Sequence, residues 1–314
     1  MRKYVLTKVV QLLAVSFIIS VAVFLLVHLL PGDPTVTILG PDDTPQNKAI
    51  LLHQLGLDKG LVTQYWTWLD NVFHGNLGRS FTTRQSVTNA LSVAVPIDVE
   101  LIVVSQVMAL VVAIPLALLA ARRPNRYLDR IATTTSFGLL ALPVFVISTI
   151  GTLILAVKLH ALPATGFTRL SQSFGDNLRS VLLPSIALAL GSVAIYYRLL
   201  RSDLVGTLQE DFVTMARSKG LSTFYVLTRH ALRPSSFSLL AGLGISIGSL
   251  FTGAFVVEYI FQLPGIGYQL WSAINARDYL VVQGMALVAA IAYLFINFVI
   301  DFLLTTLDPR VRRA

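Results

Sequence analysis

The segment IDVELIVVSQVMALVVAIPLALLAA, residues Ile97–Ala121, establishes the class of structure. After Glu100 it contains no charged side chain, and about 20 apolar residues are enough for an α-helix to cross the hydrocarbon core of a bilayer. Further apolar runs of similar length are Val9–Leu30, Ile131–Val157, Val181–Leu200, Ser235–Val257 and Val281–Leu304. None shows the alternation of polar and apolar residues that a barrel strand requires. The sequence therefore predicts an all-α polytopic membrane protein with six transmembrane helices.

The composition excludes several classes of site. Of the 314 residues, 55% are hydrophobic and 13% are charged, whereas about 25% of residues are charged in soluble domains. Because the chain has no cysteine, disulfides, thiolate metal sites and a cysteine nucleophile are excluded. The five histidines are far apart in the sequence, so we expect no metal site.

Lysine and arginine are distributed unevenly among the loops. The loops 1–8, 122–130, 201–234 and 305–314 hold 15 of them in 61 residues, whereas the loops 31–96, 158–180 and 258–280 hold 8 in 112 residues. Cytoplasmic loops carry the excess of positive charge, so the first set and both termini are predicted to be cytoplasmic. The net charge of +8 then reflects topology beside an anionic leaflet and does not indicate nucleic-acid binding.

The outer loop 31–96 is too long to be structureless. Thr44 is a candidate cap for a helix that begins at Pro45 and stops at Gly56. A second helix is predicted over Leu61–Phe73, where aromatic residues suit the membrane–water interface. This loop is either a folded cap that packs on the bundle or a docking surface for an extracytoplasmic partner. The candidate docking residues are Tyr65, Trp66 and Trp68.

The cytoplasmic loop 201–234 carries the most information. Glu210–Lys219 has a helical composition, and Gly220 lies where a left-handed residue ends a helix. Ser222 can cap a second helix that continues to Arg233 and is stopped by Pro234. Two helices joined at Gly220 predict a projecting knob, with the small Ala216 on a face that another protein approaches. Any basic loop between helices could show this pattern by itself.

The same loop resembles a known family. Asp211-Phe-Val-Thr-Met-Ala-Arg-Ser-Lys-Gly-Leu-Ser222, followed by Arg229-His-Ala-Leu-Arg-Pro234, is similar to the EAA loop of permease subunits from binding-protein-dependent ABC importers. More narrowly it resembles the B-type permease of dipeptide and oligopeptide importers. Departures from the general consensus are Thr214-Met215 in place of Glu-Ala, His230 in place of Ile, and a late Pro234.

Other segments resemble the same family in order along the chain. They are Leu29-Leu-Pro-Gly-Asp-Pro34, Gly75-Asn-Leu-Gly-Arg-Ser80, Glu258-Tyr-Ile-Phe-Gln-Leu-Pro-Gly-Ile-Gly267, Ala276-Arg-Asp-Tyr279 with Gln283-Gly284, and Asp308-Pro-Arg310. The resemblance implies a type I ABC importer fold, with residues 1–96 as a first helix plus outer loop and 97–314 as the core domain. It also implies that the loop 201–234 couples to an ATPase, through Ala216, Arg217, Lys219, Gly220 and Leu221.

The resemblance further implies a peptide importer of the bacterial cytoplasmic membrane in which this chain is not an enzyme. The chain has no phosphate-binding G-x-x-x-x-G-K-[ST] segment, so ATP and Mg²⁺ are expected on partners and no cofactor on this chain. The implied partners are a second permease (a heterodimer), two ATPase subunits and an extracytoplasmic solute-binding protein. Alternatives are the same architecture for haem, a nickel chelate or another small solute, an intramembrane enzyme, or a secondary carrier. Pro143, within the third apolar run, is a candidate pore-lining residue.

Overall fold

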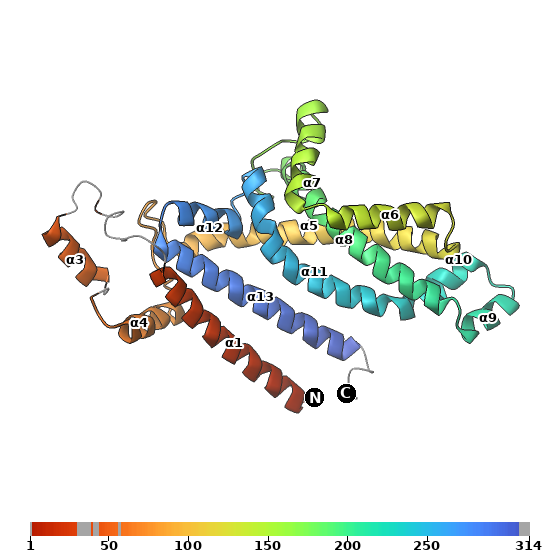
Figure 1. The fold of residues 1–314 in the computed structure, drawn as a ribbon, viewed down its shortest axis with the longest axis horizontal. Coiled ribbons are helices and arrows are strands. Elements are labelled where there is room, and N and C mark those ends of the chain that lie inside the picture. Colours follow the sequence, from red (N-terminus) through yellow and green to blue (C-terminus); the bar gives the residue numbers. More distant parts are fainter. Residues whose placement is uncertain (1, 30–38, 40–43, 56–57, 308–314) are drawn as a thin grey trace. The chain divides into compact units, whose positions relative to one another are not determined.

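A computed structural model describes residues 2–29, 39, 44–55 and 58–307 (Figure 1). In this part of the chain the structure is helical, and its one β-bridge joins Arg79 to Ser86. Five helical segments are long and apolar enough to cross a membrane, and a bent pair supplies a sixth. The straight segments are α1 (Arg2–Leu29), α5 (Val87–Arg122), α8 (Phe174–Thr207), the continuous run Thr223–Phe261 and α13 (Tyr279–Leu307). The predicted all-α class with six apolar spans is confirmed.

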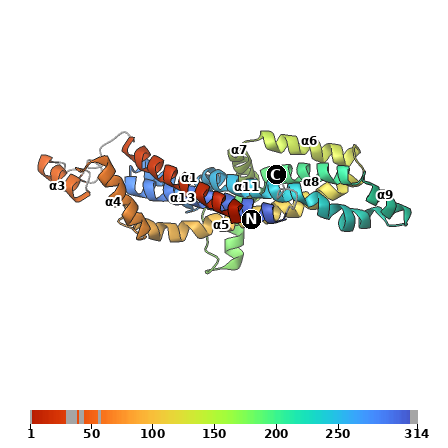
Figure 2. The ribbon, with the colours of Figure 1, turned by 90° about the horizontal axis from the view of Figure 1, so that it is seen from below.

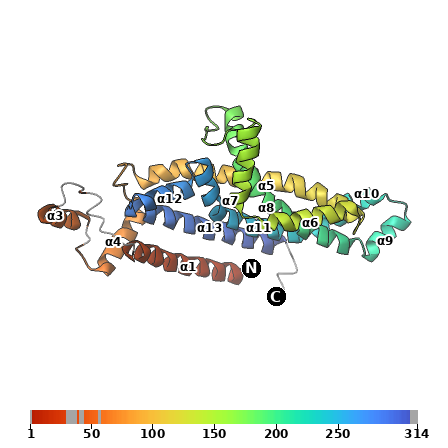
Figure 3. The same ribbon diagram turned by 45° about the horizontal axis from the view of Figure 1, so that its top comes forward.

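The third span is not the single helix that we predicted over Ile131–Val157. It consists of α6 (Tyr127–Ala141) followed by α7 (Val144–Gly151) and the π-helical segment η2 (Thr152–Lys158), with a bend of 103° between the two parts (Figure 3). Pro143 explains the break, because a proline disfavours helical geometry in the residue before it. Leu142 is accordingly extended, with φ −86° and ψ 122°.

The expectation that Pro234 stops a helix was wrong. The helix that starts at α10 (Thr223–Tyr225) continues through the π-helical segment η3 (Val226–Ala231) into α11 (Leu232–Phe261). Pro234 is the third residue of α11 and lies inside this continuous helical run, three residues after the end of η3. The π-helical segment η3 directly precedes α11, and local π geometry is one way in which a helix accommodates a proline.

The chain divides into two compact units, residues 1–97 with 264–295 and residues 98–263 with 296–314. In the second unit α8 packs between α6 and α11, and α6 runs alongside α8 (Figure 2). A row of buried alanines on α5 allows α8 to approach closely, as small residues do in membrane helix packing. The aromatic and leucine side chains of this core are Tyr196, Tyr197, Leu200 and Leu204.

The first unit holds α1, the outer loop, α12 (Ile266–Asn275) and the first part of α13. The loop contains α3 (Pro45–Leu55), where the Asn47 N–H donates to Thr44 Oγ1 at 3.3 Å, so the predicted cap is confirmed. Its second helix, α4, spans Leu61–Phe73, the range that the aromatic pattern predicts. The predicted stop at Gly56 and most of the segment Leu29–Pro34 lie outside the described residues, as does Asp308–Arg310.

Candidate functional site

Residues 208–231 form a projection that we call the knob. It follows the end of α8 and contains α9 (Asp211–Ser218), a turn at Gly220, then α10 and η3 (Figure 1). Gly220 has φ +79°, the left-handed conformation that the sequence predicts. Its N–H donates to Arg217 O at 2.9 Å, and Ser222 Oγ accepts from Tyr225 N–H at 3.3 Å. The knob is thus a capped pair of short helices.

The interior of the knob is a small apolar cluster. Val213 and Val226 are fully buried there, Ala216 is 8% exposed, and Leu208 packs against them. The expectation that Ala216 faces a partner is therefore not met in this structure, because its side chain points between α9 and the helix that follows. A larger residue at Ala216 would disturb the packing of the knob itself.

The outward surface of the knob is also apolar, and the sequence reasoning missed most of it. Met215 is 56% exposed and Phe224 is 64% exposed. We call the exposed apolar side chains of the knob the knob patch; they are Phe212, Met215, Leu221, Phe224 and Tyr225. Arg217, Lys219 and Gly220 are exposed as well. The sequence does indicate this surface, because α9 carries apolar residues on two faces. One face is enough to fill the small core of the knob, so the other is left exposed.

A partly buried ion pair lies where α8 leads into the knob. Arg201 donates from Nε to Asp129 Oδ1 at 2.9 Å and from Nη2 to Oδ2 at 2.6 Å. Asp129, at the start of α6, is 2% exposed and also accepts from the Asn125 N–H at 2.7 Å and from the Tyr197 hydroxyl at 3.1 Å. Such a bidentate pair with its remaining acceptors satisfied holds α6 and α8 in one geometry.

A groove runs along α8 in the second compact unit, and α6, α7 and α11 border it. It consists of three cavities of about 220, 210 and 480 Å³; the first and second share four lining residues, and the second and third meet at Ile195. On α8 the lining extends from Leu183 to Asp203, which at 1.5 Å per residue is about 30 Å, the thickness of the hydrocarbon core. The groove is apolar over most of this length, and Ser192, Ser246 and Ser249 lie in its middle part.

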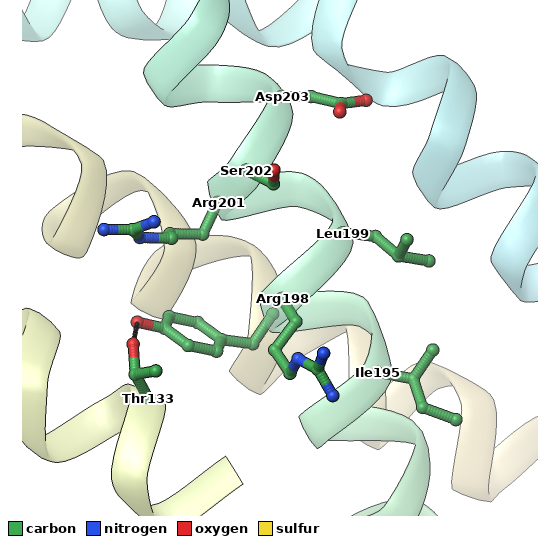
Figure 4. Close-up of a pocket in the computed structure, with 8 residues that line it drawn as sticks. Thr133, Ile195, Arg198, Leu199, Arg201, Ser202 and Asp203 are labelled. Atoms are coloured by element: carbon green, nitrogen blue, oxygen red, sulfur yellow. Dashed lines mark hydrogen bonds between the residues drawn. The ribbon is translucent and has the colours of Figure 1, made fainter. Parts of the chain in front are cut away.

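The 480 Å³ cavity at the knob end of the groove is the polar part (Figure 4). It is lined by Arg198, Arg201, Ser202, Asp203, Thr133 and Tyr197 together with two aliphatic residues. The Tyr197 hydroxyl lies 3.2 Å from Thr133 Oγ1, and the Arg198 guanidinium lies 4.6 Å from the centre of the Phe137 ring. Charged groups at this end can be hydrated, whereas the rest of the groove presents few polar groups to a solute.

The other predicted site residues have different surroundings. Pro143 is exposed and caps α7, and the cavities are lined by its neighbours Leu142 and Val144. Tyr65 is buried against α1, where its hydroxyl lies 2.8 Å from Ser20 Oγ and its ring 5.4 Å from that of Phe24. The Trp68 ring also packs on Phe24, at 5.8 Å.

Of the three candidate docking residues in the outer loop, Trp66 is the exposed one, at 57%. Tyr65 and Trp68 therefore tie α4 to α1, whereas the Trp66 side chain is exposed.

Two family descriptions match the chain. "Binding-protein-dependent transport system inner membrane component" matches residues 113–313, and the N-terminal component of the same systems matches residues 1–102. A peptide transport system permease protein of Brucella abortus (strain 2308) is 35% identical over 312 residues, 99% of each chain. The glutathione transport system permease protein of Escherichia coli (strain K12) is 32% identical, also over 99% of each chain.

Proposed function

This chain belongs to the family of binding-protein-dependent transport system inner membrane components, and on that basis we propose that it forms one half of the pore of an ATP-driven peptide importer. It is a multi-pass protein of the bacterial cytoplasmic membrane and a permease subunit, not an enzyme. The observation that carries the proposal is the match along 99% of the chain to permeases named for peptide and glutathione transport. Neither name favours haem or a nickel chelate as substrate.

Family membership implies a complex with other subunits. We propose that these are a second permease, two cytoplasmic ATPase subunits that bind ATP and Mg²⁺, and an extracytoplasmic solute-binding protein. The density of Lys and Arg supports a cytoplasmic knob and cytoplasmic termini.

The knob is proposed to be the surface on which an ATPase subunit docks. A cluster of exposed apolar side chains rimmed by charge is typical of a protein interface. The knob is held by two long helices, because α8 enters it and the continuous run from Thr223 to Phe261 leaves it. Closure of the ATPases can shift the pore between conformations only if it changes their energy difference. A rigidly held knob supplies that mechanical connection.

The groove along α8 is proposed to be this chain's share of the substrate path. Its length matches the hydrocarbon core, and a second permease facing it would convert an open groove into a closed pore. Because fixed charges line only its knob end, the rest of the groove is suited to peptides of varied side chains and not to one ion.

Reconstitution tests the proposed function directly. Vesicles that contain this chain with its sister permease, its ATPases and external receptor are expected to accumulate labelled peptide only when ATP is supplied inside. The chain reconstituted alone is expected neither to hydrolyse ATP nor to accumulate peptide. Peptide uptake by the chain alone, driven by a proton or sodium gradient, would establish a secondary carrier instead.

Cysteine accessibility tests the groove, because the chain has no native cysteine. Ile195→Cys, Leu199→Cys and Ser202→Cys place a thiol on the groove, whereas Ala194→Cys and Leu200→Cys place it on the fully buried face of the same helix. In the assembled complex we expect a small maleimide to label the groove positions about tenfold faster or more, because thiolate forms only in contact with water. Equal rates on both faces would remove the groove from the path.

Two further positions calibrate sidedness in the same experiment. An impermeant reagent added to intact cells is expected to label Gly166→Cys and to leave Ser218→Cys unlabelled until the membrane is opened. The reverse pattern would invert the proposed orientation.

A further inference from the structure

Three of the segments that carry the family resemblance take no part in the knob or the groove. They are Gly75–Ser80, Ala276–Tyr279 and Gln283-Gly284. About two hundred residues of sequence separate the first segment from the other two. In the first compact unit all three come together at one place, between the turn that precedes α5 and the start of α13. Two kinds of contact hold them there: hydrogen bonds to the side chain of Asp278, and close approaches at Gly78 and Gly284.

Asp278 lies directly before α13 and is 2% exposed. Its Oδ2 accepts from Ser80 Oγ at 2.5 Å, Phe81 N–H at 3.0 Å and Thr82 Oγ1 at 3.1 Å, with the Thr82 N–H at 3.4 Å. Four hydrogen bonds from one turn therefore converge on a single oxygen atom of Asp278. We call this contact between Asp278 and residues 80–82 the clasp.

The carboxylate acts as a tether and not as a helix cap. An aspartate before a helix usually accepts from the first N–H groups of that helix. Here the donors to Oδ2 come from residues 196 to 198 positions away. Among the described atoms, Asp278 Oδ1 is buried without a hydrogen-bond partner. The Asp278 side chain is therefore oriented for the contact with residues 80–82, and this orientation leaves its second oxygen, Oδ1, buried without a hydrogen bond from the described residues.

The glycines of the same segments make the close approach possible. A Cβ on Gly284 would lie 2.7 Å from Val87 Cγ1 and 3.3 Å from the Leu77 carbonyl oxygen. A Cβ on Gly78 would lie 3.2 Å from Leu280 Cδ1, and Gly78 has φ +91°. A side chain at Gly284 would force Val87 to shift, and one at Gly78 would press on Leu280 from a backbone conformation that residues with a Cβ rarely adopt.

We propose that Asp278 is a positioning residue that keeps the outer ends of the second and sixth spans together as one body throughout transport. The clasp joins residues 80–82, a few positions before α5, to Asp278, the residue directly before α13, so it couples the starts of the two helices. Its importance for uptake rests on the proposed transport function, whereas the contact itself is tested without any transport measurement.

Thiol labelling in nanodiscs, where both faces are accessible, tests the contact. Ser80→Cys is buried beside Asp278 and is expected to react with maleimide about tenfold more slowly than the exposed control Thr83→Cys. Adding Asp278→Ala is expected to raise the Ser80→Cys rate to that of the control and to leave Thr83→Cys unchanged. Asp278→Val, which is close in volume and has no hydrogen-bond acceptor, replaces the alanine variant if that variant fails to insert. Slow labelling of Ser80→Cys in either Asp278 variant would overturn the proposal.

Bridging tests the role in transport within one folded protein. The pair Ser80→Cys and Asp278→Cys is expected to lower peptide uptake about tenfold, the loss typical of a charge-assisted hydrogen bond. A short bifunctional methanethiosulfonate that joins the two thiols is expected to restore uptake, and a reductant to abolish it again. The single-cysteine variants treated with the same reagent are the control. Full uptake by the unbridged pair, or failure of the bridge to restore it, would contradict a clasp that stays closed.

Discussion

Arg201→Ala is expected to lower the free energy of unfolding by about 1.5–3 kcal/mol, because it removes two charge-assisted hydrogen bonds from a buried carboxylate. Asp129 is 2% exposed and receives two of its short contacts from the Arg201 guanidinium. The expected readout is a lower melting temperature of the purified permease in detergent, together with reduced insertion. Since the pair joins α6 to α8, import should fall with it.

Two variants on the same helices separate this effect from others. The neighbouring Arg198 is exposed and contacts the Phe137 ring, so Arg198→Ala should cost no more than about 1 kcal/mol. The double replacement Asp129→Leu with Arg201→Met removes both charges and should be far milder than Arg201→Ala alone. If the melting temperature of Arg201→Ala equals that of the wild type, the ion pair does not hold α6 on α8.

Met215→Asp combined with Phe224→Asp is expected to abolish import without unfolding the permease. Both side chains are exposed on the knob patch, so the free subunit tolerates them. In a docked complex each carboxylate would be buried against apolar surface, and replacing a central apolar contact commonly costs about 2 kcal/mol or more. The expected result is loss of the ATPase subunits when the permease pair is purified through a tag.

Arg217→Ala provides the comparison on the same helix. Arg217 is exposed, and an exposed ionic contact contributes about 0–1 kcal/mol. This variant should retain the ATPase subunits and most of the import activity. Equal loss in both variants would indicate that charge, and not the knob patch, makes the interface.

Local patterns in the sequence predict much of this fold. The apolar runs identify the spans, the aromatic pattern gives the bounds of α4, and Gly220 adopts the left-handed conformation expected of it. Each of these depends on neighbours within a few residues, where helix periodicity and capping operate. The face that Ala216 presents was missed because apolar residues occur on both sides of α9.

Contacts between distant residues could not be predicted in this way. Asp129 and Arg201 are 72 positions apart, and Asp278 and Ser80 are 198 apart. No periodicity links such residues, and their pairing follows from the packing of whole helices. The two prolines show the same limit, since Pro143 breaks its span by 103° whereas a helix passes through Pro234. A proline indicates a weak point, and the surrounding helices determine the outcome.

The central claim is that the knob passes ATPase closure to the pore, and one measurement tests it most directly. Receptor-stimulated ATP hydrolysis and peptide uptake are recorded on the same vesicles for wild type, Arg217→Ala and the Met215→Asp, Phe224→Asp variant. We predict that only the double variant keeps ATP hydrolysis at the unstimulated rate and peptide uptake at background. Gel filtration should show that its two permeases are still paired. Wild-type uptake by that variant would contradict the claim.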